Sequence, residues 1–415
     1  FPAPVATAAG TVLEAARRAV GGPPLRDALT RRRPGEVVVV ISDATRPIPY
    51  ADFLPELLAE LEDGGVARHE VLVLVATGMH RPTTPEERRR MLGSAAGTCR
   101  VVDHDANQDD QLVELPERSW AGARVRLNRR YVEAGFRLIT GLVEPHFMAG
   151  FSGGRKAVCP GLASLETVRR FHGPAFMSDP RARNASLSGN PCHEEALSIA
   201  RMAPPDFTLN VALDPARRVV RAFGGEMEAA HEAACRFVRE CACPPVEREA
   251  DVVVTSSGGH PLDATFYQCV KGFVSCLPAV REGGAVVALG GCTEGIGSPQ
   301  YEGLMKRYAG KWRRFLDDVR APGFFVKDQW QFQLHAGALA KVGPGSLHFV
   351  TDGLPAEELA QLSVTSHAAP PGEVEAVCQE LLNELAAAGG TVALLPEGPY
   401  CTPVAPDGRS TPLGG

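Results

Sequence analysis

Residues 144–161, "EPHFMAGFSGGRKAVCPG", hold several side chains that can take part in chemistry. His146 can exchange a proton near neutral pH, and Lys156 follows a Gly-Gly pair in a predicted loop. Backbone N–H groups exposed by glycine, together with a lysine charge, are typical of a phosphate site. A P-loop needs Ser or Thr directly after the lysine, but Ala157 stands there. The lysine is therefore expected to have another role.

Other polar side chains recur where predicted strands end. In open α/β sheets, ligands bind beyond the carboxyl ends of the strands, so we expect these side chains to line one site. The residues are Asp43, Arg46, His80, His146, Gln268 and Lys271.

Taken singly, each of these residues has a simpler interpretation. Asp43 suits a helix N-cap or a turn, and an isolated histidine is more often structural than catalytic. The structural interpretation is kept for His69, His104, His231, His348 and His367.

Taken together, the set indicates an anionic ligand held by Arg46 and Lys271, with His80 and His146 available for proton transfer. Two bases flanking one carbon suit a racemase. The 2-hydrogen of a hydroxy acid is too weakly acidic for imidazole alone, however. The glycines of "GGCTEGIGS" (290–298) lack the dinucleotide-binding spacing, and no pyridoxal phosphate pattern is visible.

The elements that must position these residues are read from short apolar runs that each stop at a polar or glycine-rich turn. Continuous apolar strands are typical of parallel sheets covered on both faces. Helical patterns between them, at 51–65 and 371–390, predict doubly wound α/β folds. The runs lie at 36–47, 70–82, 136–147, 250–261, 283–295, 345–355 and 390–399.

A chain of 415 residues favours two domains. The Pro-Pro turn and charged segment in "CACPPVEREADVVV" (241–254) indicate the boundary. We expect an N-terminal α/β domain at 1–248 and a C-terminal α/β domain at 249–390. The tail at 391–415 is expected to pack back on the N-terminal domain, and the active site to lie in the cleft between the domains.

The composition is that of an ordinary globular protein, with 44% hydrophobic and 22% charged residues. A net charge of -6 gives no support for nucleic-acid binding, and no apolar run is long enough to span a membrane. No signal-peptide pattern is visible. Eleven scattered cysteines predict reduced thiols and a cytoplasmic location.

The motifs across most of the chain, in order, resemble those of the nickel-dependent lactate racemase family. They are "SDATRPIP" (42–49), "ATGMHRPTTPEE" (76–87), "EPHFMAGFSGGRKAVCPGLASLETVRRFH" (144–172), "GNPCHEE" (189–195), "GGHPLDATFYQCVKG" (258–272) and "KDQWQFQ" (327–333). The resemblance implies a racemase or epimerase of a 2-hydroxy acid. It further implies hydride transfer through a 2-oxo acid intermediate, which avoids the weakly acidic C–H bond.

The resemblance also implies a cofactor, the nickel-pincer nucleotide. This is a pyridinium-3-thioamide-5-thiocarboxylic acid mononucleotide with Ni(II), covalently linked at Lys156, with His172 as the protein ligand to nickel. Small residues around the lysine would leave room for such a group. Proteins that synthesise the cofactor are implied as transient partners.

By position in the motifs, the family's two acid/base histidines correspond to His80 and His146. The resemblance assigns substrate binding to Arg46, Gln268, Lys271 and Trp330, and cofactor binding to Asp43, Thr45, Arg46 and Tyr267. His193, in "GNPCHEE", is interpreted as structural rather than as a ligand.

Two alternatives stay open at this point. One is an oxidoreductase that uses the same cofactor in one direction, and the other is a protein that binds the cofactor or a nucleotide without catalysis. The sequence does not indicate which 2-hydroxy acid is the substrate.

Overall fold

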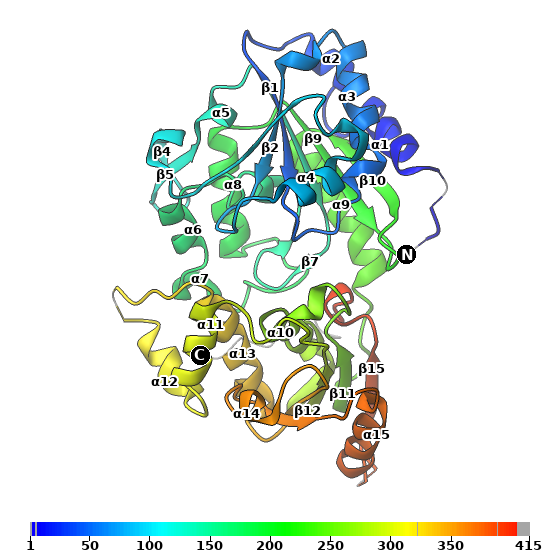
Figure 1. Ribbon diagram of the computed structural model, residues 1–415, viewed down its shortest axis with the longest axis vertical. Helices are drawn as coiled ribbons and strands as arrows, with labels where there is room; N and C mark the ends of the chain where they lie inside the picture. Colours follow the sequence, from blue (N-terminus) through cyan, green and yellow to red (C-terminus); the bar gives the residue numbers. More distant parts are fainter. Residues whose placement is uncertain (1, 5, 322, 388, 405–415) are drawn as a thin grey trace. The chain divides into compact units, whose positions relative to one another are not determined.

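The computed structural model describes residues 2–4, 6–321, 323–387 and 389–404, and these fall into two compact units. The first unit comprises the chain up to Glu144 together with Phe151–Phe171 and Leu187–Cys241. The second comprises Pro145–Gly150, His172–Ser186 and the chain from Ala242 onward. Each unit is built on its own sheet, mainly parallel in the first unit and fully parallel in the second (Figure 1).

The strands are β1 (Val37–Ser42), β2 (Val71–Ala76), β3 (Arg100–Asp103), β4 (Leu112–Arg118), β5 (Arg124–Asn128), β6 (Phe136–Leu142), β7 (Pro145–His146), β8 (Gly150–Phe151), β9 (Phe207–Leu213), β10 (Val219–Gly225), β11 (Ala250–Ser256), β12 (Val280–Leu289), β13 (Leu347–Thr351), β14 (Thr365–Ala368) and β15 (Val392–Leu395). The α-helices are α1 (Ala8–Arg17), α2 (Leu25–Leu29), α3 (Leu54–Asp63), α4 (Pro85–Leu92), α5 (Arg129–Val132), α6 (Leu165–Phe171), α7 (Pro174–Met177), α8 (Pro191–Met202), α9 (Met227–Ala242), α10 (Phe266–Cys276), α11 (Pro299–Arg307), α12 (Trp312–Asp318), α13 (Gln329–Val342), α14 (Ala356–Leu359) and α15 (Val374–Leu385).

The first sheet has six strands in the order β10-β9-β6-β1-β2-β3, all parallel except for β10, which runs antiparallel to β9. β1 lies in the middle, and its pairing with β2 runs in register from Val37↔Val71 to Ser42↔Ala76. Valine and isoleucine favour this pleated, two-sided environment because their branched side chains pack on both faces.

Helices cover both faces of this sheet. Alternate residues of β1 (Val37, Val39 and Ile41) join a buried cluster with residues of α1 and α3. On β10, Gly224 lies against the backbone of Ala15 in α1, while its neighbour Phe223 points to the other face and contacts Phe237 of α9. The first unit is thus a three-layer α/β fold.

The second sheet has five parallel strands in the order β14-β13-β12-β11-β15. One face packs against α15, where Val252, Val287 and Val350 meet Leu381. The other face carries rings from β13, α10 and α13, with Phe349 edge-on to Phe266 and Phe273. Helices therefore cover both faces here as well, and the predicted α/β class is confirmed for each unit.

All seven apolar runs identified in the sequence contain strands (β1, β2, β6, β11, β12, β13 and β15), and the two helical patterns are α3 and α15. Strands β3, β8, β9, β10 and β14 and the β4–β5 hairpin were not predicted.

The domain limits differ from the prediction. The second unit begins at Ala242 rather than at residue 249, and it also contains His172, which was predicted to lie in an N-terminal domain at 1–248. The expectation for the tail is wrong for its described part. β15 pairs with β11, and Val404 forms a bridge with Pro245, so residues 392–404 belong to the second unit. Residues 405–415 lie outside the described part of the chain.

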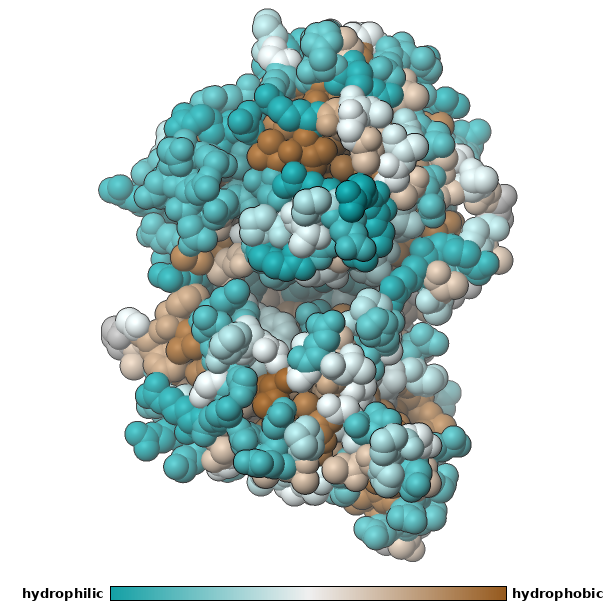
Figure 2. Space-filling model, viewed as in Figure 1, coloured by the Kyte–Doolittle hydropathy of each residue, from teal (hydrophilic) through white to brown (hydrophobic). Residues whose placement is uncertain are grey.

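The surface is mainly hydrophilic on the visible face (Figure 2). Among the described residues, the exposed large hydrophobic side chains are Trp120, Val392 and Leu394. None of the helices in this part of the chain is long and apolar enough to cross a bilayer. As predicted, the eleven cysteines, which all lie in the described ranges, form no disulfide, and most are buried.

A buried histidine makes the second unit sensitive to acid. His335 of α13 is fully buried, and its ring lies against Phe266, Phe273 and Phe332. Neither ring nitrogen makes a well-formed hydrogen bond within the described ranges. Burial, only partly offset by the Ser363 backbone, lowers the pKa of His335 to about 3. The ring is therefore neutral in the folded protein at pH 5.

We expect this group to reduce stability as the pH falls. The unfolded chain takes up a proton at His335 below about pH 6.5, whereas the folded chain does not. Stability is therefore lost from about pH 6.5 downward, by about 2 kcal/mol at pH 5. The free energy of unfolding of the second unit should therefore fall less between pH 7 and pH 5 in His335→Leu than in wild type, by about 2 kcal/mol. Denaturant unfolding at the two pH values measures this difference. The exposed His69→Leu should behave as wild type. If wild type and His335→Leu lose the same free energy of unfolding between pH 7 and pH 5, this expectation is wrong.

Candidate functional site

The carboxyl ends of two neighbouring strands place the first group of candidate residues. β1 ends at Ser42 and β2 ends at Ala76, which pair in the sheet. The chain after β1 carries Asp43, and the chain after β2 carries His80. Parallel neighbours end at the same edge of a sheet, so the two side chains meet there.

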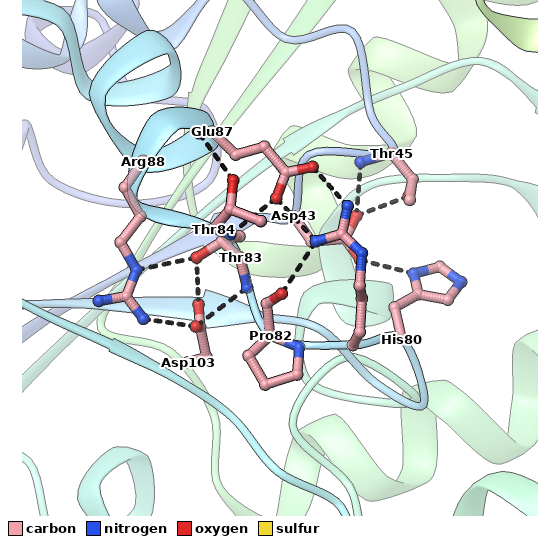
Figure 3. Close-up of polar contacts among 10 residues, drawn as sticks. Asp43, Thr45, His80, Pro82, Thr83, Thr84, Glu87, Arg88 and Asp103 are labelled. Carbon is pink, nitrogen blue, oxygen red and sulfur yellow. Dashed lines mark hydrogen bonds and ion pairs between the residues drawn. The ribbon is translucent and has the colours of Figure 1, made fainter.

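Asp43 and His80 form a close pair, with Asp43 Oδ2 2.5 Å from His80 Nδ1 (Figure 3). Asp43 is buried, and its Oδ1 also accepts hydrogen bonds from the backbone N–H and hydroxyl of Thr45, at 3.1 and 2.6 Å. Burial would raise the pKa of Asp43, but the contacts with His80 and Thr45 outweigh it and hold that pKa below its ordinary value. The ionised carboxylate accepts the Nδ1 proton, so the Nε2 of a neutral His80 carries a lone pair.

The segment that follows His80 is fixed by a series of polar contacts (Figure 3). Thr84 caps α4 in a capping box with Glu87. Arg81 forms a two-point ion pair with Glu87, at 2.6 and 2.8 Å, and the pKa of Glu87 is lowered to about 2, mainly by this contact. Thr83 donates to Asp103 at the end of β3. The His80 loop is thus tied to both α4 and β3.

Arg46 lies in the same loop as Asp43 and is paired with Glu144, with 3.8 Å between Arg46 Nη1 and Glu144 Oε1. Both side chains are partly exposed. Glu144 was not identified from the sequence, although it opens the "EPHF" motif. A carboxylate ligand that binds Arg46 would compete with Glu144 for the guanidinium.

Lys156 lies in a tight turn, a short 3-10 helix (η5, Gly154–Ala157) that follows β8. Gly153 and Gly154 have positive φ angles of 73° and 51°, which strain other residues. A Cβ on Gly153 would lie 2.7 Å from Val143 Cγ2, and one on Gly154 would lie 2.7 Å from the His231 ring. Glycine is therefore required here by conformation as well as by space.

The Lys156 amine has an unusual environment. The side chain is partly buried, and its Nζ lies 5.7 Å from the centre of the Phe171 ring. Burial and the positive charges of Arg46 and Arg155 lower the pKa of Lys156 well below its ordinary value. A larger share of this amine is uncharged at neutral pH, and an uncharged amine is nucleophilic.

In the second unit, three aromatic candidates form a connected series. The His172 ring lies 4.7 Å from the Trp330 ring, centre to centre. Trp330 Nε1 donates to the Tyr267 hydroxyl at 2.9 Å, and Gln331 donates to the Tyr267 carbonyl at 2.7 Å. The N-terminal turns of α10 and α13 thereby hold Tyr267 and Trp330 beside His172.

Gln268 and Lys271 lie three residues apart on α10, so they lie on the same side of that helix. Both are partly buried. The Gln268 Oε1 atom is buried and has no hydrogen-bond partner among the described residues. A buried acceptor without a partner is costly, and it can be satisfied by a ligand hydroxyl.

His146 belongs to the segment Pro145–Gly150 of the second unit. It is buried and stacks on Phe147, with 4.4 Å between the ring centres. Its Nδ1 faces the backbone N–H groups of Met148 and Ala149, each at 3.3 Å, and accepts from them. A proton exchanged by this ring is therefore exchanged at Nε2.

The structure thus brings the predicted residues together in two groups. The first unit holds Asp43, Thr45, Arg46, His80 and Lys156, and the second holds His146, His172, Tyr267, Gln268, Lys271 and Trp330. Sequence reasoning missed Glu144 and Asn210, whose Oδ1 accepts from Gly154 N at 2.9 Å.

His193 is half-buried on α8, and burial lowers its pKa to about 3.

Comparison with known proteins matches most of the chain to one family. Residues 2–185 match the lactate racemase N-terminal domain family, and residues 246–398 match the lactate racemase C-terminal domain family. The lactate racemase of Thermoanaerobacterium thermosaccharolyticum is 34% identical over 354 residues, which cover 84% of this chain and 80% of that protein. The lactate racemase of Lactiplantibacillus plantarum is 35% identical over 308 residues, covering 73% and 71%.

Solved structures agree with this comparison. The lactate racemase apoprotein of T. thermosaccharolyticum superposes with a TM-score of 0.84 at 30% identity, covering 95% of this chain and 92% of that one. A protein from Thermotoga maritima superposes with a TM-score of 0.69 at 17% identity, covering 92% and 97%, which shows a shared fold.

The environment of Lys156 leads to a test on the bare protein. Its lowered pKa should let limiting acetic anhydride acylate Lys156 at lower pH than other lysines. Lys306 is the internal comparison, because its hydrogen bond to Glu302 raises its pKa. Peptide mass spectrometry across a pH series gives both profiles. If Lys156 becomes reactive at the same pH as Lys306 or higher, the electrostatic account of this site is wrong.

Proposed function

The chain belongs to the lactate racemase family, and on that premise we propose that it is an isomerase that racemises or epimerises a 2-hydroxy acid. The observation that carries the proposal is the pairing of His80 with the buried Asp43 carboxylate. This arrangement leaves a basic Nε2 on a half-exposed imidazole, in the same unit as a partly exposed Arg46. A base and a carboxylate-binding group are what a hydroxy acid requires.

The residues of the chain fit the family's nickel-pincer nucleotide. Lys156 offers a partly buried amine in a glycine turn, and His172 offers one imidazole beside Trp330. No group of three or more His, Cys, Asp or Glu side chains gathers to hold a metal within the described ranges. A metal bound here would therefore take most of its ligands from an organic group, and a single imidazole suits nickel.

We propose that Lys156 tethers this group and that His172 binds its nickel ion, with Asp43, Thr45, Arg46 and Tyr267 holding the remainder. When bound, the group supplies a reversible acceptor for the 2-hydrogen as hydride. The residues of the chain then have the tasks of holding the substrate and moving the hydroxyl proton.

His80 is suited to accept the hydroxyl proton at Nε2. The imidazolium formed remains hydrogen-bonded through Nδ1 to the Asp43 carboxylate, which stabilises its positive charge. His146 exchanges its proton at Nε2 as well, because its Nδ1 faces backbone N–H groups. In the proposed reaction each histidine serves one enantiomer, and the two directions share a planar 2-oxo acid.

Arg46, Gln268 and Lys271 would hold the carboxylate and the hydroxyl oxygen of the substrate. Trp330 would line the substrate pocket. Arg46 offers a two-point contact for a carboxylate, and Lys271 adds a second positive charge. Gln268 presents a buried acceptor that a hydroxyl group can satisfy. We further propose that the enzyme works in the cytoplasm and meets cofactor-synthesis proteins transiently, in keeping with its free thiols.

The role of Lys156 can be tested by intact mass. Protein produced alongside the cofactor-synthesis proteins should carry an adduct, and Lys156→Ala should lose it. Lys156→Arg should lose it equally, because guanidinium keeps the charge but cannot form the thioamide. The exposed Lys311→Ala is the matched control and should keep the adduct. An adduct that persists on both Lys156 variants would refute the tether.

The two histidines distinguish a racemase from the alternatives. His80→Gln and His146→Gln should each slow turnover in both directions by about a hundred- to ten-thousandfold, because general acid–base groups are typically worth that much. Both variants should keep the Lys156 adduct, and His69→Gln should retain full activity. The rates are measured with each pure enantiomer of a panel of 2-hydroxy acids.

The same assay exposes the competing functions. Accumulation of 2-oxo acid without exchange of enantiomers would indicate a one-way oxidoreductase. Adduct without turnover of any panel member in wild type would indicate a binding protein. Near-full exchange in both histidine variants would show that neither is the base.

A further inference from the structure

Arg155, next to the candidate tether lysine, is a large buried cation that the proposed reaction does not use. Its side chain is 1% exposed and points into the first unit. Arg155 Nη1 donates to the backbone carbonyls of Phe151, at 3.0 Å, and Gly153, at 3.4 Å. It also lies 2.9 Å from His231 Nε2. A guanidinium placed this deep is costly, so its contacts suggest a specific task.

The contacts of Arg155 enclose the turn that presents Lys156. Its guanidinium holds the carbonyl side of residues 151–153, while Asn210 of β9 holds the N–H of Gly154. His231 of α9 lies against Gly154, and its Nε2 is also 2.9 Å from the Ser152 carbonyl. Strand β9 and helix α9 therefore fix both polar sides of the turn through side chains.

We propose that Arg155 is a positioning residue for Lys156. Its guanidinium holds the glycine turn in one conformation, and its charge lies close enough to disfavour protonation of the neighbouring amine. The role is to present an uncharged, correctly placed amine for attachment of the prosthetic group. Only the attachment part of this inference rests on the proposed function.

The charges around Lys156 support this role. Burial lowers the pKa of Arg155 to about 10, so it remains a cation at neutral pH. The other groups that act on the amine are the Arg46 cation and the thiols of Cys159 and Cys192. The two thiols favour the lysine cation, but their effect is smaller than that of burial and of the two arginines. Burial raises the pKa of Cys159, so this thiol is uncharged at neutral pH.

The chain offers a matched control for this arginine. Arg137 lies in the same unit, is also buried, and donates to the backbone carbonyls of Tyr131, Val132 and Pro204. It is not among the main charges that shift the pKa of Lys156. Substituting Arg137 should cost stability by the same mechanism without affecting the Lys156 turn.

The test compares Arg155→Gln and Arg155→Lys with Arg137→Gln and Arg137→Lys. The first measurement is the pH profile of Lys156 acetylation in bare protein, read by peptide mass spectrometry. In Arg155→Gln the profile should move to higher pH, and each unit of that shift slows acetylation on its acid side about tenfold. Arg155→Lys keeps the charge, so its profile should stay closer to wild type. Both Arg137 variants should match wild type.

The second measurement is the fraction of protein that carries the Lys156 adduct after production alongside the cofactor-synthesis proteins. Both Arg155 variants should fall to a minor fraction, because glutamine and lysine are shorter than arginine and do not reach the position from which Nη1 donates to the Phe151 and Gly153 carbonyls. The Arg137 variants should keep the adduct. If Arg155→Gln does not fold, the test rests on the adduct fraction of Arg155→Lys compared with that of Arg137→Lys. A lower fraction in Arg155→Lys supports the inference, and equal fractions contradict it.

Equal behaviour of the Arg155 and Arg137 variants in both measurements would overturn the inference. This outcome differs from a failure of the proposed function. If wild-type protein carries no adduct at Lys156, the proposed function fails, whereas the acetylation profiles still report whether Arg155 controls the amine.

Discussion

The parallel pairing of β1 with β2 on one side and β6 on the other is the constraint on which the first unit's site depends. Because the strands run the same way, the chain leaves each of them at the same edge. The β1 and β2 exits bring Asp43 to within hydrogen-bond distance of His80, although 37 residues separate them. On the β6 side, the Lys156 turn folds back so closely that a Cβ on Gly141 would lie 3.0 Å from Gly153 Cα.

Burial of charge gives this edge its chemical character. The Asp43 carboxylate stays ionised in a buried position only because His80 and Thr45 surround it with donors. Lys156 is in the opposite situation, since burial disfavours its charged form and its neighbours Arg46 and Arg155 are cations. One sheet edge therefore holds a carboxylate kept charged and an amine biased towards neutrality, and the local hydrogen bonding and neighbouring charges account for the difference.

Much of this arrangement was accessible from the sequence, for identifiable reasons. Apolar runs predict strands that are buried on both faces. A polar residue that follows such a run is predicted to lie at the carboxyl edge of the sheet. Glu144 and Asn210 escaped because the partner of an arginine or of a backbone N–H depends on tertiary folding, which leaves no local pattern. Strand β9 escaped because Thr208 and Asn210 interrupt its apolar character, although both are fully buried. The placement of His172 in the second unit could not be predicted either, because it depends on tertiary contacts of a residue that ends a continuous motif.

The division of the chain has a consequence for how the protein is made. The second unit contains Pro145–Gly150 and His172–Ser186, whereas its sheet is formed entirely from residues after Ala242. During synthesis these two segments leave the ribosome well before the strands of their own unit exist. The first unit can close its sheet once β10 has emerged, but those segments must wait for the C-terminal half. Cutting the chain near residue 242 would leave them attached to the wrong piece, so neither unit can be obtained by simple truncation.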